Sequence, residues 1–159
     1  MNKNRHKCIV GYLSTFDKAV ESISTFKGNK VGTFLYNPVK MNQARFKNRK
    51  PEDIFDEVIY DYDIEKDVRI FDPQIYMNLS EVKEPTILYV DEWLECAYRD
   101  DNPFKVNPDA LPVLIKTLEN ENITMIMCSV DEFIPEEIRD YFTTEIIEGD
   151  NPTIYKIDV

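Results

Sequence analysis

The sequence predicts a three-layer α/β fold, in which a mainly parallel sheet is covered by helices on both faces. Two continuous apolar runs, at residues 86–90 and 123–128, are rich in β-forming residues and are typical of strands buried on both faces. Segments with helical periodicity alternate with the predicted strands along the chain. Because parallel strands are joined by right-handed crossovers, this alternation places helices on both sides of the sheet.

The first elements form a strand–helix–strand unit. Residues 7–13 predict a buried strand that ends near Gly11, and residues 16–26 carry apolar side chains at helical spacing. Gly28 is a helix-stop signal, and residues 30–39 predict the next strand.

After residue 39, the sequence signals for helices and strands are less regular. We expect a single domain over residues 1–159, with the central section at 40–84 as a candidate insertion. A proline begins the first of the remaining predicted helices, and the turn signal GDNP separates the last two predicted strands. The expected helices span 51–58, 108–121 and 135–142, and the expected short strands span 68–71, 145–148 and 153–157.

Size and composition fit one compact domain. A chain of 159 residues with 43% hydrophobic content can sustain an ordinary core, since domains of this size bury roughly 70% of their unfolded surface. The three cysteines never form a CxxC pair, so neither a disulfide framework nor a zinc site is predicted. No apolar run approaches the ~18 residues of a membrane span and no signal-peptide core is present. We therefore expect a cytoplasmic protein without membrane contact.

The charge is unevenly distributed. Thirty acidic and nineteen basic residues give a net charge of -11, which repels nucleic acid and anionic membranes overall. Residues 40–50 nevertheless contain no acidic residue and five basic ones, namely Lys40, Arg45, Lys47, Arg49 and Lys50. This segment is either a solvated loop or a local contact for nucleic acid.

The presence of a single histidine excludes most catalytic and metal sites that depend on histidine. His6 is the only histidine, and we expect it to lie in a mobile, basic amino-terminal segment. This removes His-based catalytic triads and most His-ligated metal sites.

Two adjacent carboxylates follow the predicted strand at 86–90. Strand periodicity carries Asp91 and Glu92 to its carboxyl end, where open α/β sheets bind ligands, and points the two side chains to opposite sides. In ATPases, such an Asp supports the magnesium ion and such a Glu activates the attacking water. Asp91 and Glu92 are thus candidate catalytic residues, and Asp91 is the candidate metal-binding residue. The alternative is a solvated strand end.

The chain resembles P-loop NTPases of the additional-strand type, most of all the second half of FtsK/HerA-related ATPases, including viral DNA-packaging and Zot-like members. The resemblance covers about half of the chain and rests on ILYVDEW, a helix, ITMIMCSVDEFIPEEIRDYF and EIIEGDNPTIYKIDV. It implies a RecA/P-loop-like fold, with ATP and Mg²⁺ as cofactors if the nucleotide site is retained. Ser129 would sense a γ-phosphate, and Arg139 would be an arginine finger; the alternatives are a polar strand end and a surface partner of Glu136.

The phosphate-binding loop departs from the family pattern. A Walker A loop requires GxxxxGK[ST], because its glycine amides wrap the phosphates and its lysine reaches the β- and γ-oxygens. The corresponding GYLSTFDKA keeps Gly11, places Lys18 one position late and puts Ala19 where the magnesium-binding hydroxyl belongs. Asp17 adds repulsion beside a triphosphate. Gly11 and Lys18 remain candidate cofactor-binding residues, but independent ATP hydrolysis is not expected.

The leading hypothesis is a degenerate P-loop ATPase-like domain that binds a protein partner in a phage, viral or mobile-element DNA process, in the host cytoplasm if viral. A partner subunit of an oligomer could complete its site. One alternative is an active ATPase with a nonstandard phosphate loop around residues 11–18. Another is an acidic protein that imitates the charge of nucleic acid and blocks a DNA-binding protein.

Overall fold

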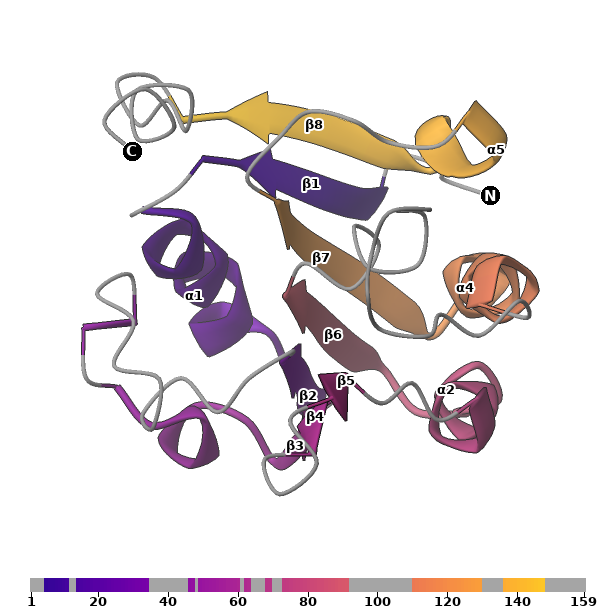
Figure 1. The fold of residues 1–159 in the computed structure, drawn as a ribbon, viewed down its shortest axis with the longest axis horizontal. Helices are drawn as coiled ribbons and strands as arrows, with labels where there is room; N and C mark the ends of the chain where they lie inside the picture. Colours follow the sequence, from indigo (N-terminus) through magenta and orange to yellow (C-terminus); the bar gives the residue numbers. More distant parts are fainter. Residues whose placement is uncertain are drawn as a thin grey trace.

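The centre of the molecule is a six-stranded parallel sheet with the strand order β3-β2-β6-β7-β1-β8 (Figure 1). The structure is a computed structural model, and it describes residues 5–11, 14–34, 46–47, 49–60, 62–63, 68–69, 73–91, 110–129 and 136–147. The strands of the sheet are β1 (His6–Val10), β2 (Asn29–Phe34), β3 (Glu57–Tyr60), β6 (Thr86–Asp91), β7 (Ile123–Ser129) and β8 (Phe142–Ile146).

Helices cover both faces of this sheet. Helix α1 (Thr15–Thr25) packs on one face, while α2 (Pro73–Leu79) and α4 (Ala110–Glu119) lie side by side on the other (Figure 1). The core on the α1 face is rich in aromatic side chains, and the core on the α2–α4 face is mainly aliphatic. This arrangement confirms the predicted three-layer α/β fold.

Strand β7 lies between β1 and β6. Val10 of β1 is opposite Ser129 of β7, and Asp91 of β6 is opposite Cys128 of the same strand. The crossover through α1 therefore passes over two strands before β2 joins the far side of β6. This all-parallel order, with helices on both faces, is consistent with a P-loop/RecA-like α/β fold.

Several predictions for the central section are wrong in detail. The helix expected at 51–58 is a single 3-10 turn, η3 (Pro51–Asp53), and β3 then pairs with β2. The short strand expected at 68–71 is β5 (Val68–Arg69), which pairs antiparallel with β4 (Tyr62–Asp63). Helix α2 is missing from the predictions, although a proline begins it. The central section thus both extends the sheet and covers one face.

The end of the described chain also differs from the prediction. The helix expected at 135–142 is α5 (Glu136–Arg139), and β8 starts at Phe142, three residues before the predicted strand. The reason is that Phe142 is buried in the core of the α2–α4 face and pairs with His6 at the start of β1. The strand expected at 153–157 lies outside the described residues.

The start of the described chain is fixed in place, contrary to the expected mobility. His6 is fully buried; its Nδ1 accepts the backbone N–H of Met125 at 2.9 Å, so Nε2 carries the proton and donates to the Leu118 carbonyl at 2.8 Å. Burial lowers the pKa of His6 to about 4, against the opposing effect of the bond to Leu118. Arg5 donates to three carbonyl oxygens around the α4–β7 turn, those of Leu118, Asn120 and Ile123.

Candidate functional site

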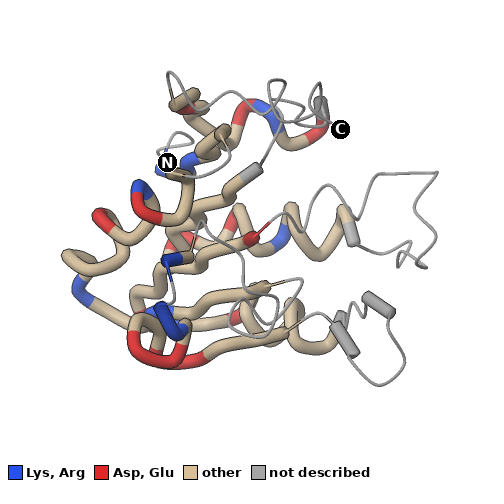
Figure 2. The backbone as a smooth tube through the Cα atoms, turned by 60° about the vertical axis from the view of Figure 1, so that its left-hand side comes forward, with Lys and Arg blue, Asp and Glu red and all other residues tan. Residues whose placement is uncertain are grey.

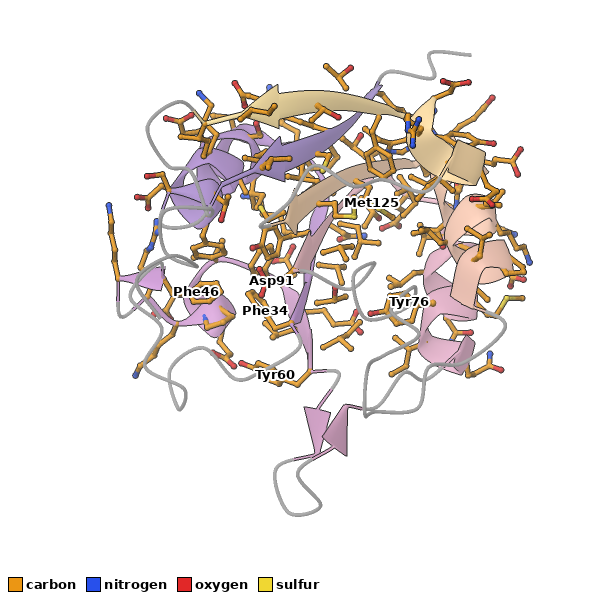
Figure 3. All side chains as sticks on the ribbon, turned by 45° about the horizontal axis from the view of Figure 1, so that its top comes forward. Phe34, Phe46, Tyr60, Tyr76, Asp91 and Met125 are labelled. Carbon is orange, nitrogen blue, oxygen red and sulfur yellow. The ribbon has the colours of Figure 1, made fainter. Side chains whose placement is uncertain are left out.

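Asp91 is the last residue of β6 and lies at the carboxyl edge of the sheet, as predicted. Its side chain is 3% exposed and shares the α1 face with Tyr89, two residues earlier on the strand. The Tyr89 hydroxyl donates a hydrogen bond to Asp91 Oδ1 at 2.8 Å. Figure 3 shows Asp91 beside the labelled aromatic residues of this face. Asp91 is therefore a buried carboxylate and not a solvated strand end; Glu92 lies outside the described residues.

The register brings Ser129 and Gly11 to the same edge. Ser129 ends β7 opposite Val10, and Gly11 follows Val10 directly and is buried. Adjacent strands lie about 4.8 Å apart, so the backbones of Asp91, Ser129 and Gly11 sit on three neighbouring strands within roughly 10 Å. The side chain of Ser129 is outside the described part, so its predicted contact with a phosphate stays a prediction.

Lys18 is directed away from this group. Helix α1 begins at Thr15, which places Lys18 in the first turn, with its Nζ 3.7 Å from Glu21 and 3.8 Å from Glu145 of β8. Strand β8 is three positions from β6 in the sheet, a separation of about 14 Å. The ammonium group thus faces the outer edge of the sheet and not Asp91.

A shallow pocket of about 380 Å³ surrounds the Lys18 side chain. Its lining carries three carboxylates and one ammonium group, together with one serine and two isoleucines: Ser14, Asp17, Lys18, Glu21, Glu145, Ile146 and Ile147. One Glu145 oxygen, Oε2, is buried without a hydrogen-bond partner. Within the lining itself, Glu21 and Glu145 both lie near the single ammonium group of Lys18, which leaves that lysine no free charge for a phosphate.

A segment that we name the strap, Phe46, Lys47, Arg49 and Lys50, is fastened to the first turn of α1. Asp17 forms ion pairs with Arg49 through Oδ1 and with Lys47 through Oδ2, the latter at 2.5 Å. The Arg49 guanidinium lies 4.8 Å from the centre of the Phe16 ring, and the Phe46 ring packs edge-on against Phe16 at 4.7 Å. Two residues of the predicted basic segment, Lys47 and Arg49, therefore neutralise an internal carboxylate.

These two cations also set the protonation of Asp17. Partial burial acts to raise the pKa of Asp17, but the hydrogen bonds and charges of Lys47 and Arg49 outweigh it and hold the pKa below its ordinary value. The carboxylate is therefore ionised at neutral pH, and it stands in the turn where a P-loop would bring phosphate.

Aromatic side chains fill the layer between α1 and the sheet next to Asp91. The rings of Phe16, Phe34 and Tyr89 lie 5.4 to 6.2 Å apart, and Phe46, Phe55 and Tyr60 extend the cluster. Figure 3 labels Phe34, Phe46 and Tyr60 of this cluster. The Phe55 ring takes the space that a Cβ on Gly32 would occupy. This packing accounts for the low exposure of Asp91.

Arg139 lies at the opposite end of the sheet. It ends α5, which precedes the first residue of β8, whereas Asp91 lies at the carboxyl edge. The five residues of β8 span about 16 Å along the strand, and β6 is three strand positions away. Arg139 could act on Asp91 only from a neighbouring subunit.

The described residues do not fit a magnesium–triphosphate group. Asp91 Oδ1 accepts a hydrogen bond from Tyr89, Lys18 is bound to glutamates, and Asp17 adds a negative charge to the first turn of α1. Within the described ranges, no group of three or more His, Cys, Asp or Glu side chains could hold a metal ion. No helix of that part of the chain is long and apolar enough to cross a membrane.

No protein-family model and no curated protein matches this chain. Among solved structures, it is similar to a chain of the bacteriophage Phi-29 viral genome packaging motor assembly, with 9% sequence identity and a TM-score of 0.44. The match covers 93% of this chain and 52% of the packaging-motor chain. This chain therefore spans about half the length of the structure that it matches. A similarity this low carries no conclusion about activity or partners.

Sequence reasoning missed two parts of this site. The contact between Tyr89 and Asp91 could have been found, because residues two apart on a strand share a face. The strap has no such signal, since Asp17 and Arg49 lie 32 positions apart and nothing in their local sequences marks them as partners.

Proposed function

We propose that this chain is a degenerate P-loop-type domain that does not hydrolyse ATP by itself and acts by binding a protein partner. The observation that carries the proposal is the state of the first turn of α1. Phosphates bound at such a helix start need backbone N–H groups and a free lysine. Here Asp17 brings a negative charge held by Lys47 and Arg49, and Lys18 is bound to Glu145.

A role in a phage, viral or mobile-element DNA process, in the host cytoplasm, is the biological setting that we propose. Its support is the sequence resemblance of the second half of the chain to viral DNA-packaging and Zot-like ATPases. Contact with nucleic acid through residues 40–50 belongs to the same proposal, as does an oligomer in which Arg139 approaches the carboxyl edge of a neighbouring subunit.

The outer edge of β8 is the surface that we propose for the protein partner. Ile146 is 57% exposed and is the one exposed large hydrophobic side chain among the described residues. It lies on the edge strand of the six-stranded sheet, beside the acidic pocket. An apolar side chain flanked by polar groups at a sheet edge suits a protein contact.

Nucleotide titration tests the catalytic half of the proposal. We expect Mg-ATP to give no binding heat in calorimetry, no rise in melting temperature and no turnover, with or without DNA, because the first turn of α1 carries the Asp17 carboxylate and its Lys18 is held by Glu21 and Glu145. Turnover that Asp91→Asn abolishes would instead establish the active-ATPase alternative. The assays are repeated at the highest soluble concentration, so that a site completed between subunits is also measured.

Affinity capture from host extract tests the partner half. We expect Ile146→Glu to lose the protein captured by the wild type, while Thr144→Ser, an exposed change on the same strand, retains it. Capture dominated by cationic proteins, lost as salt is raised and indifferent to Ile146→Glu, would support the charge-mimic alternative.

A further inference from the structure

We propose that Lys47 and Arg49 form a binding site for a phosphate of a nucleic-acid backbone, and that Asp17 competes with that phosphate for the two cations. The proposal deepens the nucleic-acid contact of the proposed function and rests on it. It adds that the described structure is the closed state, in which an internal carboxylate occupies the site.

The geometry supports a prepared anion site. Lys47 and Arg49 each contact one of the two oxygens of the same carboxylate, as they would contact two oxygens of a phosphate. The Arg49 guanidinium also rests on the Phe16 ring and donates from Nε to the Phe46 carbonyl at 3.1 Å. These contacts do not involve Asp17, so Arg49 keeps its position when the carboxylate is displaced.

The balance of charge at the strap favours replacement of the Asp17 carboxylate by a phosphate. Two cations meet one carboxylate, which leaves a net positive charge at the strap, and Lys50 adds another exposed cation. The Lys47 side chain is 65% exposed, so its ion pair with Asp17 is worth only about 0–1 kcal/mol, whereas Arg49 and Asp17 are 31% and 32% exposed and their pair is the one that a phosphate must replace in kind. A phosphodiester array can therefore replace Asp17 at small cost, because it offers repeated negative charges and releases counterions on binding.

The net negative charge of the chain explains why nucleic acid would bind only at the strap and not over the whole surface. The chain carries a net charge of -11, and Figure 2 shows acidic and basic residues interspersed along the described backbone. The run at residues 40–50, which contains no acidic residue, continues the strap in sequence. A nucleic-acid strand at the strap meets Lys47, Arg49 and Lys50, whereas the net negative charge of the chain as a whole repels it.

Fluorescence anisotropy with a labelled single-stranded DNA oligonucleotide, without nucleotide, tests the proposal. We expect Asp17→Asn to tighten binding by roughly three- to tenfold at low ionic strength, because it frees both cations. We expect Lys47→Ala to weaken binding and to lower the slope of log K against log salt by about one. Arg49→Ala should weaken binding and lower the salt slope in the same way. If loss of the contact with Phe16 unfolds the Arg49 variant, the Lys47→Ala measurement alone decides the test.

Two controls remove the same charges elsewhere. Glu121→Gln changes an exposed acid at the amino edge, and Lys116→Ala changes an exposed lysine that is also ion-paired, with Glu81, on the opposite layer. Both should leave affinity within about twofold of the wild type. The proposal is overturned if Glu121→Gln tightens binding as much as Asp17→Asn, if Lys47→Ala leaves the salt slope unchanged, or if neither wild type nor Asp17→Asn binds DNA.

A competition experiment distinguishes a phosphate of a nucleic-acid backbone from a free polyphosphate as the ligand of the strap. Tripolyphosphate should displace the oligonucleotide only at millimolar concentration, because it carries fewer repeated negative charges and no condensed counterion atmosphere to release. Displacement at micromolar concentration would replace the backbone assignment with a free-polyphosphate site. ATP turnover in the separate assay would overturn the noncatalytic function and leave these DNA measurements standing, so the two failures are distinguishable.

Discussion

The two edges of the sheet are held together by different physical means. At the amino edge, Arg5 and His6 hydrogen-bond to backbone groups of the α4–β7 turn and β7, and His6 is fully buried and neutral. At the carboxyl edge, Asp17, Lys47 and Arg49 form partly exposed ion pairs above an aromatic layer. Buried hydrogen bonds resist salt and ion pairs at the surface do not. The amino edge therefore supplies stability, and the carboxyl edge keeps charge that a ligand can recruit.

His6→Ala is the strongest test of this division. Removal of the imidazole leaves the Met125 N–H buried without its acceptor, takes one of two side-chain donors from the Leu118 carbonyl, which keeps Arg5, and opens a cavity. We expect a loss of about 4 kcal/mol in the free energy of unfolding, measured by urea denaturation at pH 7.5. A loss below about 1 kcal/mol would contradict the stabilising role given to the amino edge. Lys7→Ala, at the adjacent and less buried position, serves as the control.

The dependence of folding stability on acid pH also distinguishes the two edges of the sheet. The pKa of His6 is about 4 in the folded state and returns to its ordinary value of 6.5 on unfolding, so the unfolded chain takes up the proton first as pH falls. The stability should be highest above pH 6.5 and fall by about 3 kcal/mol by pH 4. Asp17 acts in the same direction but only near and below its ordinary pKa of 3.8. His6→Gln should flatten the profile between pH 4 and 6.5; an unchanged profile would assign the acid response to other groups.

Tyr89→Phe has the smallest expected effect and addresses the carboxyl edge. The substitution removes the hydroxyl that donates to Asp91 Oδ1 and leaves the ring in place. We expect a loss of about 1 kcal/mol in unfolding free energy at low and high salt alike, since the pair is buried. A double-mutant cycle with Asp91→Asn measures the coupling. A coupling energy near zero would show that the hydroxyl does not position Asp91.

The sequence predicts the centre of the fold better than its edges. The apolar runs of β6 and β7 are short and rich in β-forming residues, which favours buried strands over helices, and their order with α1 and α4 predicts a three-layer sheet. The short segments fail for a physical reason. Residues 57–60 and 142–144 become strands because β2 and β1 offer partners and the core receives Ile59 and Phe142, and neither partner is visible in the local sequence.

The candidate site shows the same limit. The position of Asp91 at the end of a strand follows from periodicity, and the defect in the phosphate loop follows from motif spacing. The burial of His6 is hidden by the basic residues on either side of it, which favour an exposed interpretation. The strap depends on an ion pair between residues far apart in sequence, which only the folded chain brings together.

The position of β1 in the sheet has a consequence for synthesis on the ribosome. This first strand is flanked by β7 and β8, the last two strands of the sheet in chain order. Both of its hydrogen-bonding edges therefore stay unpaired until nearly the whole described chain has been translated. Long-range pairing of this kind slows folding and exposes strand edges to aggregation meanwhile. A nascent chain that stalls before β8 would retain an apolar strand with an open side, a substrate for chaperones rather than a folded domain.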